Sequence, residues 1–273
     1  MIHPSDIGAR RFAHQAMNTE FEIFCVHDDA DYAQQAAWAA FDLLDRVERE
    51  LSRFIPNSDI SRINHAAPGE RVRVCRWTME CIELARTAFR ETGGAFDISL
   101  GTGLDRMELS ANHVEAHRGL KLDLGGIGKG YALDRMAEVL DEWDIRQALI
   151  HGGHSSVLAL DAPQGLDGWP LTMGDRNLAA RRQAFSASGV RVQGDHVVDP
   201  RTGQPARSRV AAWVSVELDG TPSPSAVAEA FSTAFLMLPD AEIDAIRVRH
   251  RGLDAWFLEN DSIHVTNGGR SDA

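Results

Sequence analysis

Four stretches of the chain carry apolar residues at three- and four-residue spacing, the pattern of a helix with one face in a core. The stretches cover residues 31–51, 77–91, 131–143 and 223–238. The second stops before Gly93-Gly94, a usual helix end. The fourth opens with Ser223-Pro224, a pair suited to an N-cap and a first helical position. We therefore predict a helix over each stretch.

Shorter runs of β-prone or alternating apolar residues predict strands between and after these helices. The predicted strands cover residues 21–26, 147–150, 157–160, 211–218, 255–258 and 263–266. Residues 161–180 are predicted to be rich in loops. Because helices and strands are mixed without a steady βαβ alternation, the pattern favours an α+β fold over a doubly wound sheet.

The chain has 28 basic and 40 acidic residues, which leaves a net charge of −12. A protein this acidic is a poor partner for nucleic acid or for an anionic membrane surface. We therefore expect no nucleic-acid function. Any phosphate-bearing ligand has to be held locally, by backbone amides, a metal ion or single arginines.

Cys25, Cys75 and Cys81 show no metal-ligand spacing, which predicts reduced, mostly buried thiols in a cytoplasmic protein. No run reaches the ~18 apolar residues of a membrane span, so no integral membrane segment is expected. Residues 1–11 lack an export signal, although an exported form with its signal removed would read the same. We predict one domain over residues 1–273, with an ordered core over 17–266 and a tail after residue 267.

A glycine-rich stretch lies between a short strand and the third predicted helix. It reads Asp-Leu-Gly-Gly-Ile-Gly-Lys-Gly from Asp123 to Gly130. Glycines let backbone amides crowd around an anion, and the following helix points its positive end at that anion. The stretch therefore indicates a phosphate site, with a simple tight turn as the alternative. It is no Walker motif, because Gly130 follows the lysine where Ser or Thr is required.

Two further patterns contain residues that could bind a ligand. Glu229 and Thr233 lie four apart, so they project from one helix face and could share a hard cation. His196 precedes the Asp199–Gly203 turn and could act as an acid or a base. Arg201 in that turn offers a planar fork for phosphate. The alternatives are an exposed glutamate with a packing threonine, and an ordinary β-turn with a surface arginine.

His151-Gly-Gly-His154 could contribute two ligands to a transition-metal site. No third ligand is evident from the spacing. The spacing therefore disfavours a metal site there.

The order of the motifs is more specific than any one of them. It is Met17-Asn-Thr, the segment 51–64, Thr-Gly-Gly-Ala-Phe-Asp ending at Asp97, the glycine-rich segment 122–134, the turn 196–203 and the helix 229–233. This order resembles the ApbE family of FAD:protein FMN transferases. The resemblance covers residues 17–238, and the segments 122–134 and 199–203 are its most specific parts.

The resemblance implies a T-fold-like α+β body with mixed or antiparallel sheets, flanking helices and FAD in a cleft, with Mg²⁺ on its diphosphate. It implies metal ligands at Glu229, Thr233 and the backbone carbonyl near Gly128. By similarity, Phe54 is the flavin-stacking residue and His196 assists the acceptor hydroxyl. The other residues implied to line the FAD site are Met17, Ser61, Arg62, Asp97, Gly125, Gly126, Lys129 and Arg201.

The activity implied is Mg²⁺-dependent transfer of FMN from FAD to a threonine or serine of an acceptor flavoprotein, with release of AMP. Two alternatives stay open: an FAD pyrophosphatase that makes FMN and AMP, and a catalytically degraded FAD-binding paralogue. They are motivated by three departures from the family pattern. His154 replaces a usual Asp, Glu229 replaces a usual Asp, and the span 96–122 is short.

Overall fold

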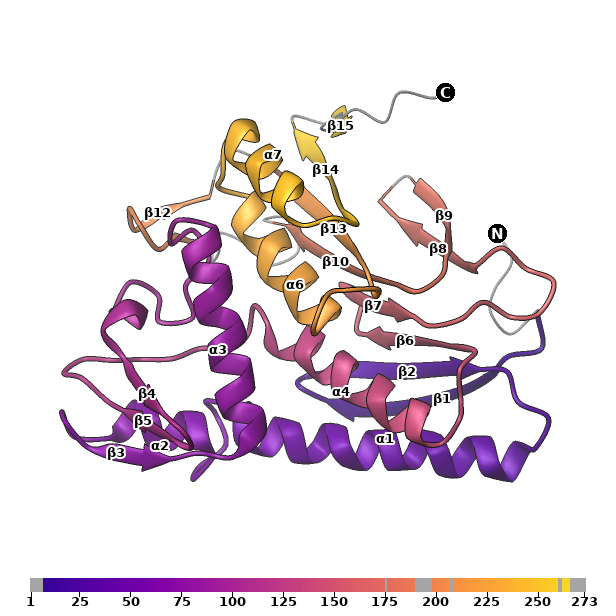
Figure 1. The fold of residues 1–273 in the computed structure, drawn as a ribbon, viewed down its shortest axis with the longest axis horizontal. Helices are drawn as coiled ribbons and strands as arrows, with labels where there is room; N and C mark the ends of the chain where they lie inside the picture. The colour runs from indigo at the N-terminus through magenta and orange to yellow at the C-terminus, as the bar shows by residue number, and fades with distance from the viewer. Residues whose placement is uncertain (1–6, 175, 190–197, 207–208, 260–261, 266–273) are drawn as a thin grey trace.

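The fold is built around one open, eight-stranded sheet, seen in Figure 1. The structure is a computed structural model, and it describes residues 7–174, 176–189, 198–206, 209–259 and 262–265. The strand order is β1-β2-β6-β7-β10-β13-β14-β15, and every pairing is antiparallel. The strands are β1 Arg10–Ala16, β2 Thr19–Cys25, β6 Ala148–Gly152, β7 Ser156–Ala159, β10 Gln183–Gly189, β13 Ala211–Glu217, β14 Leu253–Glu259 and β15 Ser262–Val265.

Helices pack on one face of this sheet, where α1, α4 and α6 lie side by side (Figure 1). The helices of this layer and its ends are α1 Ala30–Leu51, α3 Arg76–Glu91, α4 Gly128–Glu142, α6 Pro224–Phe235 and α7 Asp240–Arg249. Their apolar stripes and the facing side chains of the sheet form the larger of two cores. Helices packed against an antiparallel sheet confirm the predicted α+β class.

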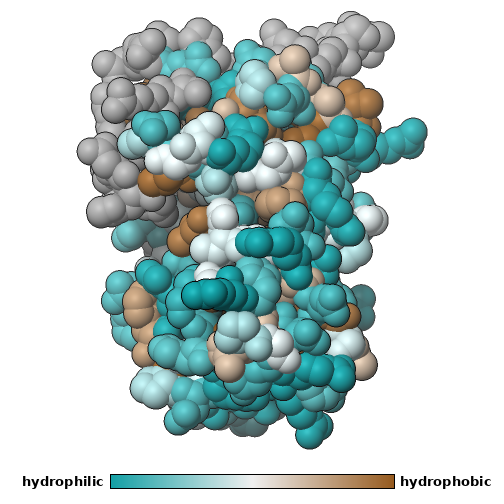
Figure 2. All heavy atoms as spheres, turned by 90° about the vertical axis from the view of Figure 1, so that its left-hand side faces the viewer, coloured by the Kyte–Doolittle hydropathy of each residue, from teal (hydrophilic) through white to brown (hydrophobic). Residues whose placement is uncertain are grey.

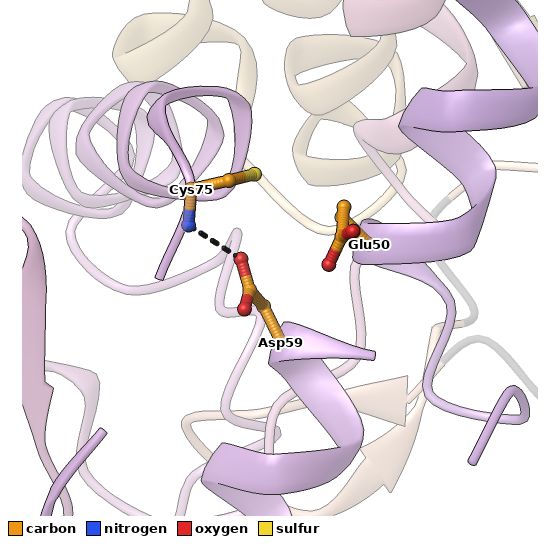
Figure 3. A group of neighbouring side chains, drawn as sticks. All are labelled: Glu50, Asp59 and Cys75. Carbon is orange, nitrogen blue, oxygen red and sulfur yellow. Dashed lines mark hydrogen bonds between the residues drawn. The ribbon is translucent and has the colours of Figure 1, made fainter. Parts of the chain in front are cut away.

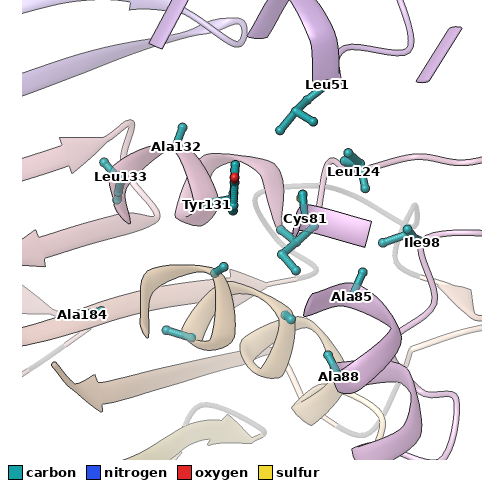
Figure 4. Close-up of a cluster of buried hydrophobic side chains, with 14 of the residues drawn as sticks. Leu51, Cys81, Ala85, Ala88, Ile98, Leu124, Tyr131, Ala132, Leu133 and Ala184 are labelled. Atoms are coloured by element: carbon teal, nitrogen blue, oxygen red, sulfur yellow. The ribbon is translucent and has the colours of Figure 1, made fainter. Parts of the chain in front are cut away.

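The inner end of α1 shows how the predicted stripes become core. Leu51 meets Cys81 of α3, Leu124 of the glycine-rich link and Tyr131 of α4 in the cluster drawn in Figure 4. Cys81 and Tyr131 have no exposed surface, and burial raises the pKa of the Cys81 thiol. Cys81 is therefore a packing residue. The prediction of free thiols is confirmed, with Cys25 also buried.

The other face of the sheet is covered by a hairpin of β8 Trp169–Met173 and β9 Arg176–Ala180. Trp169 is fully buried there, in a second core that also contains Leu171 and Trp256. The prediction that residues 161–180 are loop-rich was therefore wrong for the second half of that stretch. Trp169, Leu171 and Met173 do alternate, but the strand has only five residues, contains Pro170 and lies between two glycines, features that are typical of a loop.

A small lobe lies at the end of α3 and α1 (Figure 1). It contains α2 Asp59–His65 and a three-stranded sheet of β3 Arg71–Arg73, β5 His113–Glu115 and β4 Glu108–Ser110. The short span 96–122 supplies two of these strands and the 3₁₀ turn Leu104–Arg106. A two-stranded ladder of β11 Val198–Asp199 and β12 Gln204–Pro205 completes the described elements.

Several boundaries differ from the prediction. Helix α4 begins at Gly128, three positions before the predicted start, because its first three residues, Gly128, Lys129 and Gly130, carry no hydrophobic signal. The helices α2 and α7 were not predicted, nor were the strands β1, β3, β4, β5, β10, β11 and β12. No described helix is long and apolar enough to cross a membrane.

Candidate functional site

The glycine-rich link runs directly into the first turn of α4. The Asp123 carboxylate accepts the Gly125 amide at 2.9 Å, and the Leu124 carbonyl accepts the Gly128 amide at 2.7 Å. These bonds fold the link back on itself before the helix starts. The predicted run of the glycine-rich link into a helix is confirmed, but the short strand predicted directly before the link was wrong, since residues 116–127 contain no strand. Three of its amides, those of Gly125, Ile127 and Gly128, are however already engaged within the link.

Gly130 allows α4 to touch the start of α6. A Cβ atom on Gly130 would lie 2.2 Å from the Ser225 carbonyl oxygen, so only glycine fits without moving one helix. One turn later, the Asp134 carboxylate accepts the amides of Ser225 and Ala226 at 2.9 and 3.0 Å. The two helix starts are thus held together at backbone distance.

Asp134 caps α6 in place of the residue that we predicted. Ser223 stands at the N-cap position but has φ +50° and makes no capping bond through its side chain. Burial raises the pKa of Asp134 to about 7, against the opposing effect of the two amides. A carboxylate from another helix therefore satisfies the free amides of α6.

Helix α6 presents Glu229 and Thr233 to one hollow of the surface. The Thr233 hydroxyl donates to the Glu229 carbonyl at 3.2 Å and lies 3.2 Å from the Ser188 hydroxyl on β10. The Glu229 side chain turns toward α4, where it contacts the Lys129 ammonium at 2.5 Å and accepts the Gly130 amide at 2.7 Å. The helix spacing thus places both residues on the face of α6 that lines this hollow, and the Glu229 side chain reaches the end of the glycine-rich link.

Two hollows flank the link and share Asp123, Gly125 and Lys129. The first, about 610 Å³, lies beside the end of α1, and Met17, Phe54 and Gly128 also line it. The second, about 380 Å³, is lined by Phe96, Asp97, Leu100, Ser155, Ser188, Val198, Pro200, Glu229 and Thr233 among others. The shared residues make the link the wall between two halves of one cleft.

The face that carries the small lobe and the β11–β12 ladder is shown in Figure 2. Its lower part is mostly hydrophilic, and hydrophobic groups gather in its upper half. Leu100 and Val198 belong to the large apolar side chains that stay exposed, and both line the second hollow. The mouth of this hollow is therefore partly apolar.

Phe54 offers an open aromatic face at the first hollow. Its side chain is 77% exposed, and the Arg53 guanidinium lies 4.5 Å from the ring centroid. Arg53 in turn pairs with Asp123 at 3.2 Å. Met17, at φ +48° in the two-residue β1–β2 turn, lines the same hollow. The structure thus brings Phe54 and Met17 together with the link.

The side chains of Asp97 and Arg201 form their polar contacts with residues of their own loops. The Asp97 carboxylate accepts the Ser99 amide and hydroxyl, both at 2.7 Å, and the Gly101 amide at 2.9 Å. Arg201 pairs with Asp199 at 2.7 Å, and this contact lowers the pKa of the Asp199 carboxyl. Asp97 lines the second hollow and shapes its rim. The predicted phosphate fork of Arg201 is engaged by Asp199.

Ser61 and Arg62 line neither hollow. Arg62 donates to the Asp59 carboxylate at 2.9 Å and to the Arg73 carbonyl at 2.6 Å, so it ties α2 to β3. The same helix reaches the link through Asn64, whose amide side chain donates to the Leu122 carbonyl and accepts the Leu122 amide. Asn64 was not predicted, although it ends the same Ser-Arg-Ile-Asn motif.

Gly126 approaches Thr233 more closely than Gly128 does. An added Cβ on Gly126 would lie 3.6 Å from the Thr233 hydroxyl, whereas Gly128 lines the other hollow. Glu229 and Thr233 line the same hollow, and carboxylate and hydroxyl oxygens are donors that a hard cation such as Mg²⁺ prefers. The oxygen donors of Glu229 and Thr233 are therefore of the kind that such an ion prefers.

Outside the cleft, the described residues hold one group of three potential metal ligands, Glu50, Asp59 and Cys75 (Figure 3). Asp59 is engaged structurally, because its carboxylate accepts the Cys75 amide at 2.7 Å and the Thr78 hydroxyl at 2.8 Å. Burial also raises the pKa of the Cys75 thiol. These contacts fasten the start of α3 to α2.

The three histidines considered in the sequence lie in different places. His196, the predicted base, lies outside the described residues. His151 is on β6 with its ring edge-on to Phe24, and His154 is exposed in the following turn. Among the described residues, neither belongs to a group of three potential metal ligands.

Sequence reasoning missed the hydroxyl groups behind Thr233. The Ser188 hydroxyl lies 2.9 Å from that of Ser232, which in turn donates to Ser186 at 3.3 Å. Ser186 and Ser188 alternate on β10, so both face α6. Two serines at i and i+2 in a strand were the available signal.

An open antiparallel sheet with helices on one face and a glycine-rich link facing an acidic helix defines an α+β protein with a candidate anion and cation site between two helices. The model of the ApbE family matches this chain over residues 17–108 and 102–257. The chain belongs to the ApbE family, a family of enzymes.

Known relatives agree with this assignment. A Klebsiella pneumoniae FAD:protein FMN transferase is 26% identical over 236 residues, 71% of this chain and 72% of the relative. A Treponema pallidum protein of the same name is 26% identical over 283 residues, 81% of this chain and 76% of the relative.

Solved structures share the fold. The flavin transferase ApbE of Vibrio cholerae superposes with a TM-score of 0.79 at 18% identity, covering 94% of this chain and 96% of that one. The apo flavinyl transferase ApbE of Pseudomonas stutzeri has a TM-score of 0.82 at 19% identity, with coverage of 94% and 95%. The predicted ApbE-type α+β architecture is therefore confirmed.

Proposed function

We propose that this chain is a Mg²⁺-dependent FAD:protein FMN transferase, which moves FMN from FAD to a threonine or serine of an acceptor flavoprotein and releases AMP. The observation that carries the proposal is the divided cleft. An exposed aromatic lies in one half, Glu229 and Thr233 lie in the other, and the glycine-rich link stands between them. The names of the relatives support the same activity.

Each half of the cleft suits one part of FAD. The flavin ring would stack on Phe54, since stacked aromatic pairs gain free energy beyond their buried area. The diphosphate would lie at Gly125, Gly126 and Lys129, where one ammonium group and the start of α4 are available. Mg²⁺ held by Glu229 and Thr233 would neutralise diphosphate charge.

The transfer step exchanges the phosphoanhydride bond of FAD for a phosphoester bond to the acceptor. The acceptor hydroxyl oxygen bonds to the FMN phosphorus, and the bond from that phosphorus to the bridging diphosphate oxygen breaks. AMP leaves with the bridging oxygen. The hydroxyl proton passes to a base, a role that we propose for His196. When water takes the place of the hydroxyl, the products are FMN and AMP.

The acceptor would enter through the second hollow, whose mouth carries Leu100 and Val198. A bound protein segment would bury these apolar side chains and remove them from water. The acidic net charge of −12 disfavours nucleic acid as a partner.

The test is incubation of the purified protein with FAD and Mg²⁺, with and without a peptide that carries a threonine, followed by intact mass and AMP release. We expect a Mg²⁺-dependent mass gain of one FMN group on the peptide, blocked by EDTA. AMP and free FMN without labelling of any acceptor would identify a pyrophosphatase instead. Bound FAD without AMP would identify a binding protein and contradict the proposal.

A further inference from the structure

Lys129 and Glu229 form the buried ion pair of the cleft. Lys129 is the second residue of α4, and its ammonium lies 2.5 Å from the Glu229 carboxylate. Glu229 is 4% exposed. A carboxylate this deeply buried needs a positive partner, because leaving a buried charge unpaired is strongly destabilising. Lys129 supplies that charge.

The ammonium stands where a divalent cation would have to bind. Thr233 follows Glu229 by one helical turn, so a cation shared by these two side chains would lie beside the Lys129 ammonium. Two positive charges at such a distance repel strongly in a partly dry hollow. The cation and the ammonium therefore compete for the Glu229 carboxylate.

The Lys129 side chain can reach a second position. It lines both hollows, its side chain is 21% exposed, and its four-carbon stem is flexible. Glu229 does not need Lys129 to stay in position, because the Gly130 amide holds its other oxygen at 2.7 Å. The ammonium can leave the carboxylate while the carboxylate stays.

We propose that Lys129 is a resident counter-cation, which pairs with Glu229 until a divalent cation displaces it toward the diphosphate. This inference rests on the proposed function for the identity of both ligands. It predicts that cation and diphosphate bind cooperatively, since the diphosphate receives the ammonium that the cation releases. By linkage, each ligand then increases the affinity of the other by the same factor.

The experiment measures Mn²⁺ binding without any flavin, from the electron paramagnetic resonance signal of free Mn²⁺. The test variant is Lys129→Gln, which removes the charge and keeps a hydrogen-bond donor. The matched control is Lys121→Gln, which changes the only other lysine of the chain. Lys121 is exposed and donates to the Asn64 carbonyl, outside the ion pair.

We expect Lys129→Gln to bind Mn²⁺ on the order of tenfold more tightly than the parent, because a competing charge is gone. Lys121→Gln should bind like the parent. Equal or weaker binding by Lys129→Gln would overturn the proposal, since that is the result of a lysine that only positions Glu229.

A second measurement leaves Lys129 unmutated, so it does not depend on the folding of that variant. The lysines are reductively dimethylated with ¹³C-formaldehyde and a borohydride, which preserves their charge, and their methyl signals are assigned with Lys121→Arg. Addition of Mg²⁺ should shift the Lys129 signal and leave the Lys121 signal in place. A Lys129 signal that stays unchanged at saturating Mg²⁺ would overturn the displacement.

The two proposals fail in different ways. Transfer or cleavage of FAD is scored by AMP release, whereas the displacement of Lys129 is scored by Mn²⁺ affinity and by NMR. Normal AMP release with equal Mn²⁺ affinities would overturn the role of Lys129 alone. Lack of Mn²⁺ binding by the parent and both variants would overturn it together with the metal requirement.

Discussion

At the scale of single residues, one face of α6 combines two different environments. Glu229 is directed at the start of α4, while the Thr233 hydroxyl lies against Ser188 and opens to the second hollow. Four residues of spacing thus separate a buried, charge-paired carboxylate from a hydroxyl at the cleft surface. Substitutions of Glu229 and of Thr233 should therefore have different effects, on packing in the first case and on ligand binding in the second.

Thr233→Ala should reduce Mg²⁺-dependent FAD turnover by roughly a hundredfold or more, since a bound metal is worth several kcal/mol of charge stabilisation. The fold should persist, because alanine is a good helix residue. Thr233→Ser is the matched control and should keep most activity through its hydroxyl. AMP release at a series of Mg²⁺ concentrations makes the comparison, and an unchanged Mg²⁺ dependence in Thr233→Ala would exclude Thr233 as a ligand.

Phe54→Ala should raise the KM for FAD by about tenfold with little change in kcat, because aromatic stacking is worth roughly 0.5–1.5 kcal/mol. Phe54→Tyr keeps the ring and should behave like the parent. Val248→Ala removes another exposed apolar side chain, one on α7, and controls for general surface effects. Steady-state kinetics with varied FAD concentration test this prediction. A KM of Phe54→Ala equal to that of the parent would show that Phe54 does not contact the flavin.

At the scale of elements, the site depends on the contact between the first turns of α4 and α6. Gly130 permits this approach, and Asp134 holds it through two amides of α6. Because α4 carries the end of the glycine-rich link and α6 carries Glu229, this contact sets the distance between the candidate anion and cation groups.

Gly130→Ala should lower the stability of the protein by about 1–3 kcal/mol, the range of overpacked sites, because its Cβ would overlap the Ser225 carbonyl. Gly128→Ala is the matched control in the same turn. Its Cβ would have no neighbour closer than 3.9 Å, and it should be neutral or stabilising. Thermal unfolding of both variants tests this, and equal melting temperatures would refute the close contact.

Asp134 should make stability depend on pH. Its pKa is about 7 in the folded chain and near 3.8 when unfolded, so unfolding between these values releases a proton. The contribution is therefore fully present below about pH 4 and is lost as pH rises toward 7. Asp134→Asn should remove this component. Denaturant unfolding from pH 4 to 8 measures it, and parallel curves for both proteins would show that Asp134 does not titrate there.

At the scale of the molecule, the cleft joins parts of the chain that are distant in sequence. The end of α1, the link before α4, β10, the β11–β12 ladder and α6 all line it. A ligand that binds across them stabilises the native arrangement as a whole. The small lobe contributes through Asn64, which holds the segment before the link.

FAD and Mg²⁺ together should therefore raise the melting temperature more than either alone. A ligand at a hundred times its Kd adds about 2.7 kcal/mol, or roughly 5–10 °C for a chain of this size. EDTA should reverse the Mg²⁺-dependent part. Thr233→Ala, which keeps the flavin side, should lose only that part. Thermal shifts of the two proteins in all four conditions test this, and a parent insensitive to Mg²⁺ in the presence of FAD would contradict it.

Much of the fold could be predicted because its signals are local. The stripe of α1 is apolar at every inward position, and the helix appears over Ala30–Leu51, one residue longer than predicted. The hairpin of β8 and β9 was missed because short strands with Pro170 inside and glycines beside them resemble a loop. Trp169 is buried only because the hairpin folds back onto the sheet.

Part of the candidate site could also be predicted. Motif order placed Glu229, Thr233, Phe54 and the link in one protein family, and the structure brings them to one cleft. Arg62 was expected in the same cleft but contacts Asp59 and the Arg73 carbonyl. A residue inside a matching motif need not face the ligand, since helix rotation decides which side chains do.

The sequence by itself determined the acidic surface, the amphipathic helices, the glycine-rich link and the membership of the ApbE family, because composition, periodicity and motif order are properties of the chain. The tertiary structure alone decided that Lys129 neutralises Glu229, 100 residues away, and that Asp134 caps α6 in place of Ser223. Such pairings depend on how two helices cross. That crossing is set by packing over the whole core, including the absence of a side chain at Gly130.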